Sequence, residues 1–363
     1  MPSAAASGPI PSLDSFSTAA FQIFITAYPE AKRLLDYQAL DLQKFYAGAR
    51  VYYGGGFHTV ADPVLHFWDS IQTLTNPIGT VLDKLLIGLA RLRVLSRSDE
   101  EILAADEVPT IEFLRKFGFS ESIIGRFFRP FFGGVFFDRE LETTSRPLRF
   151  YLQMPRSRRQ YSSGEGHICN SRTVGFETAD RFGSAELEVE EPEVAKLLGL
   201  KPAEKKPARS TVCLYFSADR RQIPVREPIL FLNGSGKGIV NNMFFATNVA
   251  PSYGPPGKAL VSVSLIGLYD AVSDADLTAQ VVGELSDWFG ESIVGSWEHL
   301  RTYRVGFAQP NQSPPTNLVK DPRIGSGIYV CGDHVTSATF DGALVSGGRA
   351  VEALLRDRVK SPN

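Results

Sequence analysis

The stretch GIYVCGDHVTSATFDGALVSGGRAVEALL, residues 327–355, decides the fold class of this chain. It opens with a short run of apolar, β-branched and aromatic residues that predicts a buried strand. Gly332 and Asp333 follow, and a Thr/Ser/Ala turn leads to a helix that we expect to begin at about Asp341. Apolar residues then recur at helical spacing as far as Leu355. The order of strand, glycine turn and helix indicates an α/β domain.

The turn and the start of this helix carry groups that suit a cofactor. Gly332 has no Cβ, so the backbone can approach a phosphate or a ribityl chain closely. Asp333 is placed to accept hydrogen bonds from ribityl hydroxyls. The helix start at Gly342, Ala343 and Leu344 offers N–H groups and the positive end of a helix dipole to an electron-rich ligand edge. The alternative is a plain strand-turn-helix whose first aspartate is only a cap, and the residues alone favour neither interpretation.

The same stretch resembles the terminal motif of the flavin-containing amine oxidase, protoporphyrinogen oxidase and phytoene desaturase superfamily. That motif has a hydrophobic strand, Gly-Asp or Gly-Glu, an acidic-Gly-Ala triplet, Ser-Gly and a basic, alanine-containing helix. The matching positions are Gly332-Asp333, Asp341-Gly342-Ala343 and Ser346-Gly347. The resemblance implies FAD as the cofactor, with Asp333 at its ribityl-pyrophosphate part and the backbone of residues 342–344 at the isoalloxazine ring. The implied cofactor-binding residues are Gly332, Asp333, Asp341, Gly342, Ala343 and Leu344.

Four other segments resemble the phytoene-desaturase-like branch of this superfamily. They are FQIFITAYPEAKRLLDY (21–37), FHTVADP (57–63), FFRPFFGGVFFDRELETTS (127–145) and EEPEVAKLLGL (190–200). The resemblance covers most of residues 21–145 and 185–357. It implies an α/β fold with an α+β insertion, in which a helical and antiparallel-sheet substrate domain is inserted into an incomplete Rossmann-like FAD/NAD(P)-binding domain.

The expected organisation has five parts. Residues 1–20 form a disordered leader, 21–150 a mainly helical first part of the substrate domain, and 151–205 an irregular residual FAD-domain segment. Residues 206–310 form the antiparallel sheet of the substrate domain, and 311–363 the C-terminal FAD-binding strand-turn-helix. Strands are predicted at 21–27, 186–189, 211–216, 228–233, 239–247, 259–267 and 297–307, with a glycine-turn hairpin at 50–60. Helices are predicted at 29–35, 110–117 and from Ser273 or Asp274 to about Phe289.

One expected part of the flavin site is missing from the sequence. Members of the superfamily begin with a strand, a GxGxxG turn and a helix that bind the FAD pyrophosphate. No such turn occurs here, and the glycine cluster 234–238 lies between strands and predicts a hairpin turn. Its Lys237 suggests a phosphate loop, but the GK[ST] ending is absent. We therefore expect a truncated or degenerate flavoenzyme with weakened FAD binding and unpaired sheet edges.

Three further segments leave alternatives open. The run 127–137 holds six phenylalanines and predicts either an aromatic wall around an apolar substrate or, as we favour, a core turn between two helices. The arginine-rich stretch 146–172 predicts a poorly ordered segment rather than a basic binding patch. Residues 81–91 have charges at helical spacing and predict an amphipathic helix that faces a core or a partner.

Composition excludes several classes of function. The chain has 363 residues, 43% of them hydrophobic, and a formal net charge of −2, which does not fit a nucleic-acid-binding protein. Three cysteines and five histidines show no ligand spacing, so we expect no metal site. The sequence contains no apolar run of about 18 residues, so we expect no transmembrane helix. Peripheral membrane contact stays open. The Ser/Ala-rich N-terminus suggests a plastid transit peptide, although it lacks arginine, and the alternative is a disordered leader on a cytoplasmic protein.

These features predict an FAD-dependent oxidoreductase that abstracts hydride from a C–C or C–N bond of a hydrophobic small molecule. The alternative is a non-catalytic, degenerate paralogue that binds an apolar ligand or a protein partner, and a third interpretation is a carrier of isoprenoid-like molecules. The sequence nominates no catalytic acid or base, because the histidines are scattered and only His334 lies within the motif. It indicates neither the electron acceptor nor the oligomeric state.

Overall fold

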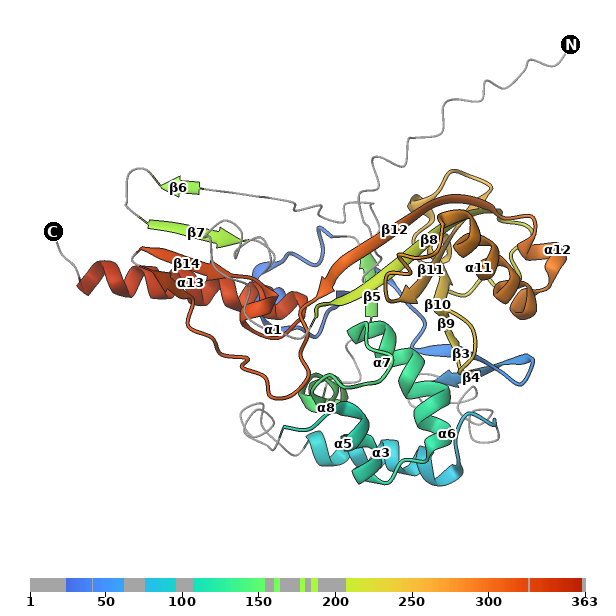
Figure 1. Ribbon diagram of the computed structural model, residues 1–363, viewed down its shortest axis with the longest axis horizontal. Coiled ribbons are helices and arrows are strands. Elements are labelled where there is room, and N and C mark those ends of the chain that lie inside the picture. The colour runs from blue at the N-terminus through green and yellow to red at the C-terminus, as the bar shows by residue number, and fades with distance from the viewer. Residues whose placement is uncertain are drawn as a thin grey trace, which may run out of the picture.

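The computed structural model describes residues 24–40, 42–61, 76–95, 107–153, 160–163, 177–179, 184–188, 207–325 and 327–360. A large sheet with its helices lies on one side of the molecule, and a long helix with a small sheet lies on the other (Figure 1). The predicted leader, the segment 190–200 and most of the predicted segment 151–205 lie outside the described residues. No helix in the described part of the chain is long and apolar enough to cross a membrane.

The large sheet has seven strands in the order β12-β8-β11-β10-β9-β3-β4. Every neighbouring pair is antiparallel except β3 and β9, which run parallel. All the strands predicted between residues 211 and 307 are present, and the predicted glycine-turn hairpin forms the edge pair β3–β4. The strands are β3 (Gly48–Tyr53), β4 (Gly56–Ala61), β8 (Arg209–Asp219), β9 (Leu230–Asn233), β10 (Val240–Phe245), β11 (Lys258–Ile266) and β12 (Glu298–Gln309).

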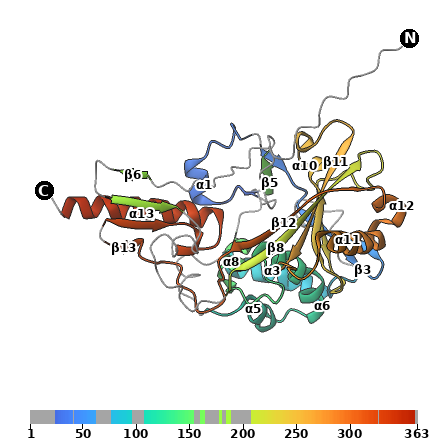
Figure 2. The same cartoon turned by 45° about the horizontal axis from the view of Figure 1, so that its top comes forward.

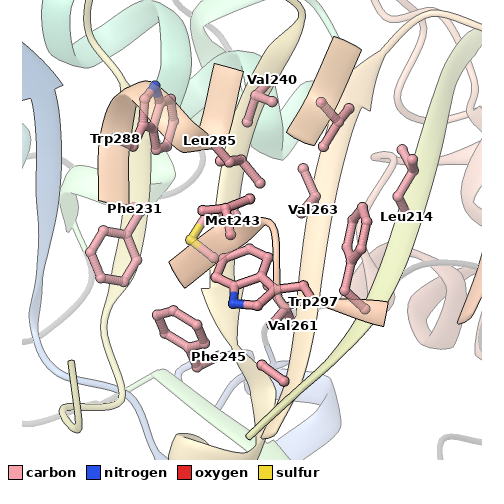
Figure 3. Packing of buried hydrophobic residues seen from close by; sticks show 14 of the residues in the cluster. Leu214, Phe231, Val240, Met243, Phe245, Val261, Val263, Leu285, Trp288 and Trp297 are labelled. Carbon is pink, nitrogen blue, oxygen red and sulfur yellow. The ribbon is translucent and has the colours of Figure 1, made fainter. Parts of the chain in front are cut away.

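One face of this sheet is covered by α11 (Asp274–Phe289), followed by α12 (Glu291–Val294). Ser273 caps α11 by accepting a hydrogen bond from the Asp276 amide at 3.1 Å, and Gly290, with φ of 96°, ends it. The buried residues of α11 recur at helical spacing and pack on the strands together with Phe231, Met243 and Val261 (Figure 3). The core of the molecule therefore lies between the sheet and α11. Two short helices, α10 (Ala246–Val249) and η3 (Pro251–Tyr253), connect β10 to β11.

A separate group of helices lies beside the sheet. It consists of α3 (Val81–Leu95), α5 (Thr110–Phe117), α6 (Glu121–Ile123), the π-helical turn η2 (Ile124–Phe128), α7 (Arg129–Phe136) and α8 (Ser145–Gln153). The prediction of a turn in the phenylalanine run is wrong, because η2 and α7 make this run continuously helical. Phe128, Phe132 and Phe136 are buried one helical turn apart, with successive ring centroids 6.0 and 5.7 Å apart. The favoured core assignment is confirmed for these rings, and the helix ends at Phe137 with φ of 49°.

The helix predicted at residues 81–91 is present as part of α3, but apolar side chains lie on both of its faces and not on one alone. Asp83 and Ala90 are buried on its inner face, where the Asp83 carboxylate accepts hydrogen bonds from the Thr80 and Ser120 amides at 2.7 and 2.8 Å. Its opposite face is apolar and exposed. The exposed side chains are Val81, Leu82, Leu85, Leu89 and Leu92, each with 55–66% of its surface accessible.

Two smaller sheets complete the fold. The order β13-β14-β7-β6 joins β13 (Arg323–Gly325), β14 (Ile328–Cys331), β7 (Ser184–Glu188) and β6 (Glu177–Ala179), and the order β1-β5-β2 joins β1 (Phe24–Ile25), β5 (Gln160–Ser163) and β2 (Leu42–Lys44). The helix α1 (Pro29–Leu34) follows β1 as predicted. Regular structure at α8 and β5 corrects the expectation that the stretch 146–172 is poorly ordered, and the rest of that stretch lies outside the described residues.

Candidate cofactor site

The candidate site lies where β14 ends. This strand runs parallel to β7, with Ile328 opposite Ala185 and Cys331 opposite Glu188, and the short helix η4 (Asp333–Val335) and α13 (Phe340–Lys360) follow it. Gly332 joins β14 to η4 with φ of 134°, a conformation open to glycine but strained for other residues. In α/β sheets, ligands bind beyond the carboxyl ends of parallel strands. Gly332 and the half-buried Asp333 therefore lie at the expected end of the sheet.

Ser346 fixes the end of this strand to α13. The Gly332 amide donates to Ser346 Oγ at 2.8 Å, and Ser346 Oγ donates to the Ala343 carbonyl at 2.7 Å. Ser346 is buried, so both bonds are shielded from water. The sequence motif included Ser346 without a role for it, and the structure shows that it orients Gly332 on the helix.

The expectation of free N–H groups at Gly342 and Ala343 is wrong. The Gly342 amide donates to Thr339 Oγ1 at 2.9 Å, and the Ala343 amide donates to the Thr339 carbonyl at 3.0 Å. Thr339 therefore caps the start of α13. Its side chain accepts from the amide three residues later, as capping side chains usually do, and its carbonyl accepts from the amide four residues later. Leu344 is half-buried in the same turn of the helix. These three backbone positions can face a flavin ring, but the first two amides are already bonded.

Asp341 caps a different helix from the one in which it lies. Its Oδ1 accepts hydrogen bonds from the amides of Glu30 and Ala31, each at 2.9 Å, and thereby satisfies the N-terminus of α1. Burial raises the pKa of the Asp341 carboxyl above its ordinary value, more than these two hydrogen bonds lower it. Burial, and then the nearby Asp341 charge, raise the pKa of Tyr28 to about 12. Asp341 thus connects α13 to a segment about 310 residues earlier in the chain.

Two substitutions at Asp341 should separate its hydrogen bonds from its charge. Because one oxygen accepts both bonds, Asp341→Asn keeps them, whereas Asp341→Ala loses them and should cost about 1–2 kcal/mol. A raised carboxyl pKa favours the folded state at low pH, and this contribution is lost as pH rises through the folded pKa. The stability of Asp341→Asn relative to the unsubstituted chain should therefore increase from about pH 3 to about pH 7. Urea unfolding followed by circular dichroism across this range measures both effects, and a flat difference would contradict the assignment.

The turn between β14 and α13 is held by two buried polar residues, Gln312 from the segment after β12 and Thr336 from the turn itself. Gln312 Nε2 donates to the Thr336 carbonyl at 3.0 Å, and Thr336 Oγ1 donates to the Gly342 carbonyl at 2.7 Å. Gly342 has no room for a side chain, because a Cβ there would overlap the Ser337 carbonyl oxygen. Sequence reasoning missed Gln312 and Thr336, since isolated polar residues carry no periodic pattern.

The residues present fit one half of FAD. Gly332 allows close approach of the backbone, Asp333 supplies a carboxylate acceptor for ribityl hydroxyls, and the start of α13 lies close by in the chain. No part of the sequence supplies a GxGxxG turn for the pyrophosphate. Within the described residues, no group of three or more His, Cys, Asp and Glu side chains could hold a metal ion. The site is therefore suited to the ribityl and isoalloxazine parts of a flavin.

This geometry defines an α/β protein in which a strand-turn-helix lies beside a mostly antiparallel seven-stranded sheet with its helices. Residues 191–355 match a family model described as flavin containing amine oxidoreductase. The predicted resemblance to the flavin-containing amine oxidase superfamily is thereby confirmed for this region, which makes up just under half of the chain. The family implies FAD as the cofactor. No curated protein has a significant sequence match to the chain.

Solved structures share the fold across almost the whole chain. An oxidoreductase from Methanosarcina mazei is 13% identical with a TM-score of 0.59, covering 92% of this chain and 87% of that one. A putative protoporphyrinogen oxidase from Exiguobacterium is 14% identical with a TM-score of 0.58, covering 98% and 91%. A reduced UDP-galactopyranose mutase is 13% identical with a TM-score of 0.58, covering 93% and 84%. Identities this low establish a shared fold and confirm the predicted fold class, without identifying a substrate.

Proposed function

We propose that this chain is an oxidoreductase that uses FAD to abstract hydride from a hydrophobic small molecule. The observation that supports this most strongly is the parallel pair β14–β7, which ends at Gly332 and Asp333 within the region that matches the flavin family. Bound FAD would supply the hydride acceptor. The protein would orient the flavin, with Asp333 accepting from the ribityl hydroxyls and the backbone at Gly332 approaching closely.

The flavin analogues FAD, FMN and riboflavin test this half-site directly. If the chain contacts only the ribityl and isoalloxazine parts, the three should bind with Kd values within about threefold of one another, a difference below about 1 kcal/mol. Flavin fluorescence quenching measures each Kd, and gel filtration followed by an absorption spectrum shows whether flavin stays bound. Absence of binding for all three would refute the proposal. Much tighter binding of FAD would show that the adenosine half has its own contacts.

Asp333 and Asp321 form a matched pair for the same assay. Asp333→Ala removes the proposed ribityl acceptor and should weaken riboflavin binding about tenfold, the usual effect of losing a hydrogen bond to a charged group. Asp321, an exposed aspartate in the turn before β13, is the control, and Asp321→Ala should leave the riboflavin Kd unchanged. Equal effects of the two substitutions would remove Asp333 from the site.

A second candidate function, non-catalytic binding to an apolar partner, is supported by the exposed leucine face of α3. The face of one 15-residue helix, roughly 22 Å by 10 Å, is small beside the roughly 800 Å² per partner of a stable protein interface. A single helix can bind at the surface of a lipid bilayer, where the binding strength scales with the apolar area that it buries. The exposed Arg93 on the same helix suits anionic headgroups. We therefore propose peripheral contact of α3 with an anionic membrane surface.

Co-sedimentation with phosphatidylcholine–phosphatidylglycerol vesicles tests this contact. The double variant Leu85→Glu, Leu89→Glu should lower the bound fraction about tenfold, since each glutamate opposes both insertion and the anionic surface. Val319 is equally exposed, at 65%, and lies outside α3, so Val319→Glu serves as the control. The proposal fails if the unsubstituted chain stays in the supernatant, or if both variants sediment alike.

A further inference from the structure

A pocket of about 640 Å³ lies between the η2–α7 helix and the turn that joins β9 to β10. Figures 1 and 2 place its elements α6 and β3 on the other side of the molecule from the far end of α13. Its lining includes Arg126, Arg129, Arg139 and Lys237. We propose that this pocket binds a small phosphate-bearing anion, separately from the flavin site.

The lining carries more positive than negative charge. Two carboxylates, Glu121 and Glu140, also line the pocket, but both already have cationic partners. Glu140 pairs with Arg129 at 2.7 Å, and Glu121 pairs at 2.6 Å with Arg115, which lies outside the lining. Among the lining side chains that form no ion pair, positive charges therefore outnumber negative ones.

Three of the lining cations have no ion-pair partner among the described residues. The Arg126 guanidinium lies 4.1 Å from the centre of the Tyr53 ring and donates to a backbone carbonyl. Arg139 donates to the Ile239 carbonyl at 3.3 Å and is attracted at longer range by the half-buried Glu284. Lys237 is exposed at the rim and has no side-chain partner in the described part of the chain. An anion in the pocket would supply the partner that all three lack.

The glycine-rich turn 234–238 is held rigidly, so Lys237 is presented from a fixed backbone. Asn233 Nδ2 donates to the Lys237 carbonyl at 2.7 Å and to Glu284 Oε1 at 2.8 Å. Glu284 Oε2 accepts from the Ile239 and Val240 amides at 2.7 and 3.0 Å. A preorganised turn spends little conformational entropy when a ligand binds.

The arrangement of cations favours phosphate over a simple carboxylate. A carboxylate monoanion matches one cation, whereas a phosphate monoester or diphosphate carries two or more charges and several acceptor oxygens for guanidinium and ammonium donors. The turn is followed by a strand rather than by a helix, so recognition would come from side chains and not from a phosphate-loop helix end. The sequence assignment of a hairpin turn is therefore correct, and its lysine has a proposed role of a different kind.

Equilibrium dialysis of the full chain with radiolabelled pyrophosphate at low ionic strength tests the proposal. We expect saturable binding that weakens with added salt. Lys237→Ala and Arg139→Gln should each raise Kd about five- to tenfold, the range for loss of one charge contact in a partly open site. Lys258→Ala, at an exposed lysine at the start of β11, is the charge-matched control and should leave Kd unchanged.

Each result decides the proposal once circular dichroism shows that the variants are folded. Absence of saturable binding overturns it. Binding that is unchanged in both Lys237→Ala and Arg139→Gln places the anion elsewhere, including at the flavin turn, and also overturns it. Weaker pyrophosphate binding in Lys237→Ala and Arg139→Gln, together with an unchanged Kd in Lys258→Ala, supports binding in the pocket. Because riboflavin carries no phosphate, its binding should be unaffected by Lys237→Ala, which keeps this test independent of the flavin proposal.

Discussion

Gly342→Ala should destabilise the C-terminal strand-turn-helix by about 3 kcal/mol, combining overpacking with the loss of a hydrogen bond. The new Cβ would overlap the Ser337 carbonyl oxygen and lie 2.9 Å from Thr336 Oγ1. Relief of the overlap requires the turn to move away from α13. That movement breaks the bond of 2.7 Å from Thr336 Oγ1 to the Gly342 carbonyl and the bond of 2.9 Å from the Gly342 amide to Thr339.

Hydrogen exchange with mass spectrometry measures this loss locally, because residues 340–355 open with the turn. A change of about 3 kcal/mol corresponds to roughly 100-fold faster amide exchange across the start of α13. Gly348→Ala is the matched control. Gly348 lies in the same helix, is exposed and has open space around its Cβ position, so alanine there should stabilise the helix by up to about 1 kcal/mol. Equal exchange in the two variants would contradict the packing argument.

Phe231→Ala should lower the free energy of unfolding of the seven-stranded sheet and its helices by about 3–5 kcal/mol. Phe231 is fully buried in β9, and its ring centroid lies 5.2 Å from Phe57, 5.3 Å from Phe289 and 5.9 Å from Phe245. These rings belong to the edge hairpin, to α11 and to the central sheet. Removing Phe231 therefore opens a cavity at the point where three parts of the domain meet.

Urea unfolding followed by tryptophan fluorescence measures this change, because Trp288 and Trp297 belong to the same core cluster. Val319→Ala, at a position 65% exposed, should change stability by less than about 0.5 kcal/mol and is the control. Hydrogen exchange at residues 340–355 in the Phe231→Ala variant adds a second readout. Unchanged protection of these amides would show that residues 340–355 and the large sheet unfold separately. A small decrease in the free energy of unfolding measured by fluorescence would contradict the proposed role of Phe231.

Several elements could be predicted from sequence because their signals are local. Ser273 and Gly290 delimit α11, and the glycine pair at 54–55, with φ of 63° and 81°, turns the β3–β4 hairpin. The phenylalanine run, predicted as a turn, contains Gly133 and Gly134, which are weak helix formers. Burial of Phe128, Phe132 and Phe136 on one face outweighs that local preference and keeps the segment helical.

Contacts between distant segments could not be predicted in this way. The parallel pairing of β14 with β7 joins Ile328 to Ala185, and no pattern within either strand specifies its neighbour. The cap that Asp341 supplies to α1 and the four cations around the turn at Lys237 likewise join residues far apart in the sequence. Such contacts depend on how complete elements pack, and only the folded chain determines that.

The sequence by itself determined the strand-turn-helix of residues 327–355, its resemblance to the superfamily and the absence of a GxGxxG turn. These features depend on backbone preference, apolar periodicity and glycine positions, which involve only residues close together in the sequence. The tertiary structure decided how that motif is used. It showed that Thr339 occupies the amides of Gly342 and Ala343, that Ser346 binds the Gly332 amide, and that the Asp341 carboxylate serves α1. Hydrogen-bond partners follow from proximity in space, so the groups that remain for a flavin are known only after the chain has folded.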